Sequence, residues 1–311
     1  MSKDSFTIFA GRANMALATR VAVEMGARLG ACSVERFPDG ELSVRLDEPV
    51  RGREVFIIQP TSPPVNDHLI ELLAFADACR RASAAHITAV TPYFGYARAD
   101  KRVGRREPIT ASMVADLMQA VGINHVVTID LHAPQIEGFF HIPVDSLTAA
   151  PVMVEALRPR LPEEIVVVSP DAGRVRTATE YARLLGAPVA VLHKERASGV
   201  ETRVTRLVGD VRDRSCLIVD DMISTGGTIV ESIEALRSAG ARPEIIVAAT
   251  HGLLLAGARE KLMRGEAREV LVTDTVAASG PGWPRLRVVS IAPLIAATLR
   301  RFLADGSLSE L

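Results

Sequence analysis

LIVDDMISTGGTIVES, residues 217–232, joins an apolar run to two adjacent aspartates and then to a loop of Ser, Thr and Gly. The run that ends at Val219 predicts a buried strand, and the segment from Ile229 onward predicts a helix. Asp220 and Asp221 would then lie at the C-terminal end of the strand, where α/β sheets place their ligands. The stretch therefore predicts a strand–loop–helix unit of an α/β protein with a ligand site at this edge.

The two halves of this stretch suit different chemical groups. In the loop Ser224–Thr228, Gly226 and Gly227 permit positive φ, while the hydroxyls and the helix N-terminus favour an anion. The carboxylates of Asp220 and Asp221 repel phosphate, but they can accept hydrogen bonds from vicinal sugar hydroxyls. A phosphorylated pentose satisfies both halves, with Asp220 and Asp221 on the hydroxyls and Ser224, Thr225, Gly226, Gly227 and Thr228 around the phosphate.

Short β-branched runs alternate with helical segments along the whole chain. Helices are predicted between several of the runs, for example over residues 14–30, 66–83 and 173–186. This alternation favours an α/β fold with mostly parallel sheets flanked by helices on both faces. The predicted strands are FTIFA, EVFIIQ, HITAVTPY, HVVTIDL, IVVVSP, PVAVLH, CLIVDD, EIIVAAT, EVLVTDT and LRVVSIA.

Two segments of the chain follow the same order of elements. Residues 53–93 and 214–250 each run from a charged start through a strand, a polar turn and a helix to a second strand. We interpret them as parts of two similar domains, residues 1–148 and 149–311, although any two such units can align this well. In the first segment Gln59-Pro60 replaces the aspartate pair. Only the second segment is therefore predicted to bind the sugar phosphate through an aspartate pair and a glycine loop.

Composition limits the functional classes. The chain has 311 residues, 48% of them hydrophobic, and a net charge of −1, so no global field favours nucleic acid or an acidic membrane. The start, MSKDSFTIFAGRAN, lacks the apolar run of a signal peptide, and no stretch is long enough to span a bilayer. Three distant cysteines indicate free thiols. These features predict a cytoplasmic protein without nucleic-acid or membrane partners.

Other phosphate-binding signatures are missing: the sequence has neither GxxxxGK[ST] nor a GxGxxG after a strand. The DD–TGGT segment instead resembles the phosphoribosyl-binding motif of phosphoribosyltransferases and ribose-phosphate pyrophosphokinases. Simple phosphoribosyltransferases have one such domain and lack the other segments of this chain. From about residue 7 to residue 302 the sequence is similar to ribose-phosphate pyrophosphokinases, through RFPDGE, YARADKR, REPITASMVADLM, TIDLHAPQIEGFF, IPVDSL, SPDAGRVR and HKER in that order.

The resemblance implies a domain pair of the phosphoribosyltransferase type and assigns roles to single residues. Lys194 and Arg196 in HKER, together with Arg98, would be catalytic and would stabilise charge on the transferred group. His132 and Asp171 would organise Mg²⁺, which prefers oxygen ligands and retains several waters. Taken alone, a surface charge cluster would explain HKER better, and a structural histidine would explain His132 better.

The N-terminal half would provide the ATP contacts. The resemblance implies a mobile basic loop at 98–107 and a turn, RFPDGELSV, whose aromatic ring stacks on adenine in a neighbouring subunit. A solvated basic loop and a plain β-turn are the alternatives. Ala99 stands where the family usually has an amide side chain, which removes one nucleotide contact. The implied ATP-binding residues are Phe37, Asp39, Glu41, Arg98, Asp100 and Lys101, with Arg102 as a further candidate.

The implied reaction transfers pyrophosphate from ATP to the C1 hydroxyl of ribose 5-phosphate, giving 5-phosphoribosyl 1-pyrophosphate and AMP. The resemblance also implies a homo-oligomer, at least a dimer, with the active site near a subunit interface. Two alternatives stay open: a phosphoribosyltransferase, and a catalytically silent regulatory homologue. Loss of the lysine, the histidine or the aspartate pair would indicate the silent homologue, and the sequence retains all of them.

Overall fold

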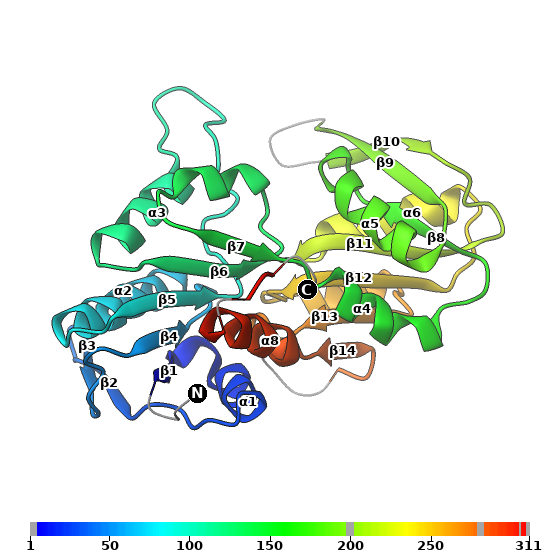
Figure 1. The fold of residues 1–311 in the computed structure, drawn as a ribbon. Coiled ribbons are helices and arrows are strands. Elements are labelled where there is room, and N and C mark those ends of the chain that lie inside the picture. Colours follow the sequence, from blue (N-terminus) through cyan, green and yellow to red (C-terminus); the bar gives the residue numbers. More distant parts are fainter. Residues whose placement is uncertain (1–4, 197–201, 279–282, 305, 309–311) are drawn as a thin grey trace. The chain divides into compact units, whose positions relative to one another are not determined.

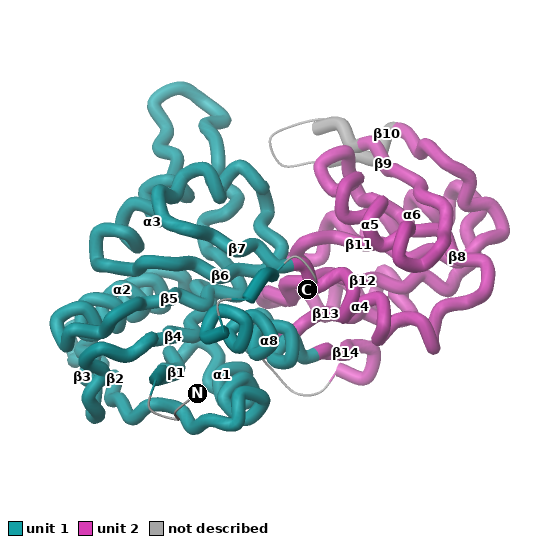
Figure 2. Tube along the Cα trace, in the orientation of Figure 1, with its two compact units in different colours: residues 1–147, 275–277, 290–311 teal, residues 148–274, 278–289 magenta. Residues whose placement is uncertain are grey.

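The computed structural model describes residues 5–196, 202–278, 283–304 and 306–308; the side chains of residues 194–205 are outside this description. The chain divides into two compact units (Figure 2). Unit 1 comprises residues 1–147, 275–277 and 290–311, and unit 2 comprises residues 148–274 and 278–289. The chain first passes from unit 1 to unit 2 between residues 147 and 148, one residue before the domain boundary expected between residues 148 and 149. The difference is at the C-terminus, which the sequence assigns to the second domain and which groups with unit 1.

Unit 1 contains a parallel five-stranded sheet in the order β1-β4-β5-β6-β7 (Figure 1). A separate antiparallel hairpin of β2 and β3 precedes β4. The strands are β1 (Phe6–Ala10), β2 (Cys32–Arg36), β3 (Leu42–Leu46), β4 (Glu54–Ile58), β5 (His86–Thr91), β6 (His125–Ile129) and β7 (Val144–Leu147). The helices are η1 (Arg12–Asn14), α1 (Met15–Glu24), α2 (Val65–Arg81), α3 (Thr110–Ala120), η2 (Pro134–Phe139) and α8 (Ala292–Leu303).

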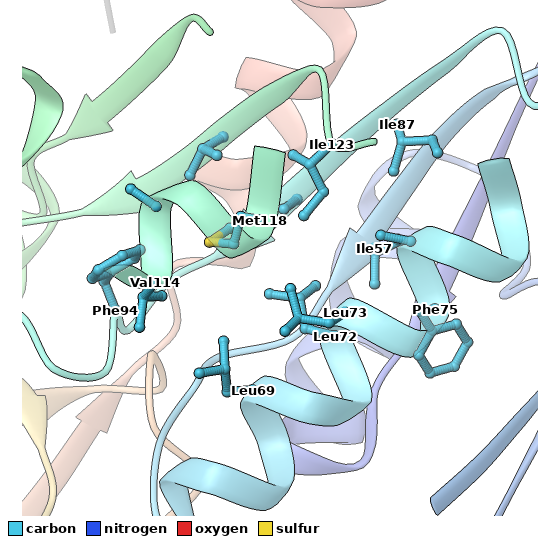
Figure 3. Packing of buried hydrophobic residues seen from close by; sticks show 14 of the residues in the cluster. Ile57, Leu69, Leu72, Leu73, Phe75, Ile87, Phe94, Val114, Met118 and Ile123 are labelled. Carbon is cyan, nitrogen blue, oxygen red and sulfur yellow. The ribbon is translucent and has the colours of Figure 1, made fainter. Parts of the chain in front are cut away.

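One large apolar core lies between the sheet of unit 1 and helices α2 and α3 (Figure 3). Alternate residues of each strand face it, for example Ile57 of β4 and Ile87 of β5, as strand geometry requires. Leu72 and Phe75 of α2 and Met118 of α3 fill it, and all three are buried.

Helix α8, near the C-terminus, belongs to unit 1, where its apolar face is buried. It packs against α1, and it buries Ile295, Ala296 and Leu299. Near its C-terminal end, the ring of Phe302 lies 4.6 Å from that of His125 on β6, measured between ring centroids. The amphipathic pattern of residues 292–303 predicts the helix, but it does not specify which other helix the apolar face packs against.

Unit 2 contains a seven-stranded sheet in the order β10-β9-β8-β11-β12-β13-β14, parallel except for the β10–β9 pair. Its strands are β8 (Ile165–Ser169), β9 (Val189–Arg196), β10 (Thr202–Val208), β11 (Ser215–Ile223), β12 (Ile245–Gly252), β13 (Glu269–Thr273) and β14 (Leu286–Val289). Its helices are α4 (Ala150–Leu157), η3 (Arg158–Arg160), η4 (Ala172–Arg174), α5 (Val175–Leu185), α6 (Gly227–Ser238) and α7 (Ala258–Arg264).

The predicted α/β architecture is confirmed, and each of the ten predicted strands is present. Strands β2, β3, β7 and β10 were not predicted. The two similar segments correspond to β4–α2–β5 in unit 1 and β11–α6–β12 in unit 2. Among the described residues, no helix combines the length and the apolar character needed to cross a membrane.

Candidate active site

The aspartate pair lies near the end of β11, the central strand of the unit 2 sheet. Asp220 and Asp221 are only 8% and 5% exposed, which is rare for carboxylates that are not paired. The backbone N–H of Asp221 donates to Oδ1 of Asp220 over 2.8 Å. The local structure therefore fixes the first carboxylate, and both carboxylates are withdrawn from water just before the loop that connects β11 to α6.

A cation compensates these two charges. Nε of Arg174 lies 3.6 Å from Oδ1 of Asp220 and 3.4 Å from Oδ1 of Asp221, and the Arg174 side chain is 14% exposed. Arg174 belongs to the turn that follows β8, a neighbour of β11 in the sheet. This turn thus brings a guanidinium to the aspartate pair.

Burial raises the pKa of Asp220 well above its ordinary value, because the charged form loses its hydration. The neighbouring Asp221 adds to the rise through charge repulsion and a hydrogen bond, while Arg174 acts in the opposite direction. The pair is therefore electrostatically costly when ionised. Such a cost is characteristic of a site that acquires further partners when it binds a ligand.

The loop that connects β11 to α6 has the shape of an anion site. Gly226 adopts a φ of 76°, and an added Cβ would lie 3.2 Å from Cγ of Leu262. Thr225 and Thr228 are exposed, and α6 begins at Gly227. The backbone N–H of Leu255 donates to the carbonyl of Ser224 over 3.0 Å, which anchors the start of the loop. The exposed hydroxyls of Thr225 and Thr228 and the N-terminus of α6 therefore lie together at this loop, an arrangement that suits an anion.

Asp171 lies in the turn after β8. Its Oδ1 accepts hydrogen bonds from the N–H groups of Gly173 (2.7 Å) and Arg174 (3.2 Å), so the carboxylate caps the turn η4. This capping fixes the backbone from which Arg174 extends. A carboxylate has a second oxygen, so the capping role leaves Asp171 able to bind a cation as well.

Lys194 and Arg196, the predicted catalytic residues of HKER, lie at the C-terminal end of β9. Their backbones pair with β10, where Lys194 is opposite Val204 and Arg196 is opposite Thr202. The side chains of both residues lie outside the described part of the structure. Their roles stay predictions.

Unit 1 contains a cavity of about 630 Å³ at the start of α2. Arg98 and Ala99 line it together with Asn66, Asp67 and Tyr96. Tyr96 has a φ of 63°, which is a strained conformation for a bulky residue and is typical of functional sites. The Tyr96 hydroxyl donates a short hydrogen bond to Oδ1 of Asn66. Of the residues predicted to bind ATP, Arg98 lines this cavity, beside Ala99, the position where the family usually has an amide side chain.

The predicted basic loop extends from unit 1 between β5 and α3 (Figure 1). Lys101 and Arg102 are exposed, as are Arg98, Arg105 and Arg106. The base of the loop is fixed, because buried Asp100 accepts a hydrogen bond from the side chain of Gln135. Near the tip, Glu107 accepts from the N–H groups of Val103 and Gly104, and these bonds lower the pKa of Glu107.

The RFPDGE turn is the tip of the β2–β3 hairpin. Phe37 is 46% exposed, which is high for an aromatic side chain, and Asp39 and Glu41 are exposed beside it. Arg36 forms an ion pair of 2.7 Å with Asp67 of α2. The tip therefore presents an aromatic ring and two carboxylates to the outside of unit 1.

His132 and Asp171, the two predicted magnesium ligands, belong to different units. His132 follows β6 in unit 1 and is half-buried, and Asp130 before it has a φ of 42°. Within the described residues there is no group of three or more His, Cys, Asp or Glu side chains that could hold a metal. A site with few protein ligands suits Mg²⁺, which retains waters and shares substrate phosphates. Joint binding of one ion by His132 and Asp171 stays a prediction.

Two functional candidates were missed by the sequence reasoning. Arg174 is the last residue of the motif SPDAGR, but nothing in that motif indicates contact with aspartates 46 and 47 residues away along the chain. For Asp67, the sequence predicts only a position in the helix over residues 66–83. Its acidic side chain in the first helical turn gives a weak signal, because such residues also stabilise the helix N-terminus.

Comparisons with known proteins agree with both units. Residues 6–122 match the N-terminal domain of ribose phosphate pyrophosphokinase, and residues 161–284 match the phosphoribosyl transferase domain. Ribose-phosphate pyrophosphokinases of Caldanaerobacter subterraneus subsp. tengcongensis and Thermotoga maritima are each 45% identical. The alignments cover 99% and 98% of this chain and 98% and 97% of those proteins.

A solved structure agrees over the same length. The crystal structure of phosphoribosylpyrophosphate synthetase from Mycobacterium smegmatis superposes with a TM-score of 0.91 at 43% sequence identity. The match covers 97% of this chain and all of that one (100%). Coverage of both units at this identity excludes a likeness limited to a single phosphoribosyltransferase domain. The chain belongs to the ribose-phosphate pyrophosphokinase family.

Proposed function

We propose that this chain is a ribose-phosphate pyrophosphokinase that converts ATP and ribose 5-phosphate into 5-phosphoribosyl 1-pyrophosphate and AMP. The observation that carries the proposal is the arrangement at the end of β11, where a buried aspartate pair is followed directly by an anion-binding loop. The sugar would lie along this segment, with its hydroxyls on Asp220 and Asp221 and its 5-phosphate in the loop 224–228.

The reaction requires the C1 hydroxyl oxygen to attack the β-phosphorus of ATP. The new C1–O–P bond forms as the bond between the β-phosphorus and the oxygen that bridges it to the α-phosphorus breaks; AMP leaves and the hydroxyl proton is released. In such a transfer the protein mainly positions the reactants and stabilises charge. Lys194, Arg196 and Arg98 provide cations for that charge in this proposal. Loop 98–107 would close over the nucleotide and exclude water, which protects ATP from hydrolysis.

Mg²⁺ is the proposed cofactor, held by His132 and Asp171 together with substrate phosphates, and it would neutralise phosphate charge. The donor set fits this ion in part, because the carboxylate supplies an oxygen ligand and the imidazole can bind directly or through water. On the nucleotide side, Phe37 would stack on adenine, and Asp39 and Glu41 would accept from its amino group. Lys101 would contact the phosphates, and Asp100 would support the ATP-binding loop at its base through the hydrogen bond from Gln135.

The exposed hairpin tip supports a homo-oligomer in which Phe37 enters the active site of a neighbouring copy. The ring of Phe37 is 46% exposed at the end of the hairpin, so a neighbouring copy can reach it. The cytoplasm, which supplies ATP and phosphorylated sugars, is the location that fits this proposal.

One assay tests the proposed activity. AMP release from ATP is followed with and without ribose 5-phosphate, and the product is checked for a pyrophosphate on C1. We expect AMP only when the sugar phosphate is present. The variant Lys194→Ala, prepared in the same way, controls for contaminating ATPases and should release little AMP. AMP formation that does not depend on the sugar phosphate would contradict the proposal.

A further inference from the structure

The hairpin tip that carries Phe37 is closed by its own hydrogen bonds. The N–H of Phe37 donates to the carbonyl of Glu41 over 2.8 Å, and the N–H of Gly40 donates to the carbonyl of Phe37 over 2.9 Å. The N–H of Glu41 also donates to Oδ1 of Asp39 over 3.1 Å. Gly40 adopts a φ of 96°, which the turn requires and which glycine permits. The shape of the tip is therefore local, and the strands below it determine where it points.

The inward face of the hairpin changes its character near the tip. Cys32 and Val34 of β2, with Leu46 and Val44 opposite them on β3, pack against the core of unit 1. Because side chains alternate along a strand, Arg36 lies on the same face as these two residues of β2. At Arg36 the apolar contact gives way to an ion pair, in which Nη1 lies 2.7 Å from Oδ2 of Asp67.

Asp67 also lies at the rim of the cavity in unit 1. It lines the space of about 630 Å³ together with Asn66, Arg98 and Ala99. Asn66 is itself held by the hydroxyl of Tyr96, so this part of the rim is fixed. The ion pair with Arg36 thus joins the residues around the cavity to the last residue of β2, which directly precedes Phe37.

We propose that Arg36 and Asp67 are positioning residues, which fix the direction of the hairpin tip so that Phe37 meets the base of the nucleotide. This inference rests on the proposed function, in which the tip serves the nucleotide site of a neighbouring copy. An ion pair between half-exposed side chains contributes little to stability. Its effect is therefore expected in nucleotide binding and not in folding.

The test exchanges the two charges. Arg36→Asp and Asp67→Arg are made singly and together, and the affinity for α,β-methylene-ATP is measured by calorimetry beside the KM for ATP, the KM for ribose 5-phosphate and the Tm. Stacking of a base on an aromatic ring contributes roughly 5- to 150-fold to affinity. Because a half-exposed ion pair can bias the direction of the tip by only a few-fold, we expect each single variant to weaken nucleotide binding about 2- to 5-fold. The KM for ribose 5-phosphate and the Tm should change little.

The double variant Arg36→Asp/Asp67→Arg should regain most of the nucleotide affinity, and Arg36→Lys should retain it. A matched control lies on the same hairpin, where Arg45 and Asp47 also form an ion pair of 2.7 Å but at the end away from the tip. Arg45→Asp should leave nucleotide affinity unchanged. If Arg36→Asp does not fold, Arg36→Gln replaces it in the same measurements.

Three outcomes would overturn the inference: unchanged nucleotide affinity in Arg36→Asp, an equal loss in Arg45→Asp, or no recovery in the double variant. Loss in Asp67→Arg alone would mean that Asp67 contacts the nucleotide itself. Failure of the proposed function looks different, because the wild-type chain would then form no AMP in response to ribose 5-phosphate. The calorimetric measurement with the nucleotide analogue does not depend on turnover, so it tests the pair in either case.

Discussion

Replacing Arg174 with glutamine should destabilise unit 2, and it should do so more at neutral pH than at acidic pH. The substitution keeps much of the side-chain volume and a hydrogen-bonding group but removes the positive charge that lies 3.6 Å from Asp220 and 3.4 Å from Asp221. Because all three side chains are nearly buried, water can replace the lost charge only in part.

The size of the effect follows from the geometry. At an effective dielectric constant of about 20, each of these contacts corresponds to a gross attraction of roughly 4–5 kcal/mol. Most of that attraction offsets the cost of burying the guanidinium, and breaking a buried pair costs at most about 3–5 kcal/mol. Asp220 can also escape part of the loss by taking up a proton. We therefore expect a net loss of about 2 kcal/mol at neutral pH, which lowers the Tm by roughly 4–8 °C.

The dependence on pH has a definite sign. The pKa of Asp220 is raised in the folded chain, so above its unfolded value of about 3.9 the folded state binds more protons, and this group favours folding less as pH rises. Arg174→Gln raises the folded pKa of Asp220 further. The gap in Tm between wild type and variant should therefore be small in acid and should widen as pH rises through the folded pKa.

The assay is differential scanning calorimetry at several pH values between acid and neutral. Arg183→Gln, in the same helical region, is the matched control, because Arg183 forms an exposed ion pair of 2.7 Å with Glu180. Its Tm should stay near that of the wild type, since exposed pairs contribute about 0–1 kcal/mol. A Tm gap for Arg174→Gln that stays constant with pH, or that is widest in acid, would refute the electrostatic reasoning.

Three further predictions concern the sugar-phosphate and transfer sites. Asp221→Asn should raise the KM for ribose 5-phosphate roughly tenfold, since hydrogen bonds to charged groups contribute about 1.5–3 kcal/mol; unaltered sugar affinity by calorimetry would remove the diol role. Lys194→Ala should lower kcat by about 10²–10³ and leave the KM for ribose 5-phosphate within a few fold, and steady-state kinetics with near-normal kcat but a much larger KM would contradict its transition-state role. Gly226→Ala places a side chain at a φ of 76° and should cost roughly 1–2 kcal/mol, with a larger KM for ribose 5-phosphate. Gly227→Ala, whose added Cβ has its nearest neighbour at 3.9 Å, is the control for that variant, and equal losses in Tm for the two would refute the argument from backbone strain.

The predicted strands and the missed strands differ in how they are buried. Segments such as IVVVS and EVFII are almost entirely buried, so they read as continuous apolar runs. β7, by contrast, is the four-residue segment VDSL with no fully buried residue, and β2 is CSVER, half-buried at most. Such strands are stabilised by pairing with a neighbour, and the sequence of the strand alone carries little trace of that pairing.

The same distinction, between features set within one segment and features set by contact between segments, applies to the candidate site. Asp220 to Thr228 are consecutive in the chain, so a single strand–loop–helix unit determines their arrangement, and the motif predicted that unit. The contact of Arg174 with this motif, and that of Arg36 with Asp67, join elements that are distant in sequence. Sequence patterns at the period of a helix or strand describe one element at a time, and they do not specify which side chains meet across elements.

Arg174 also explains how two carboxylates can precede the loop 224–228, the proposed site of the phosphate. Without a compensating cation, Asp220 and Asp221 would add repulsion to any anion held by the N-terminus of α6. With the guanidinium at 3.4–3.6 Å, the field that they project toward the loop is reduced, while their remaining oxygens can still accept from hydroxyls. In the proposed site, the turn after β8 and the end of β11 would therefore act together and would select a ligand with hydroxyls at one end and a phosphate at the other. A cation from the turn after a neighbouring strand would make the DD–TGGT sequence consistent with the proposed phosphate binding.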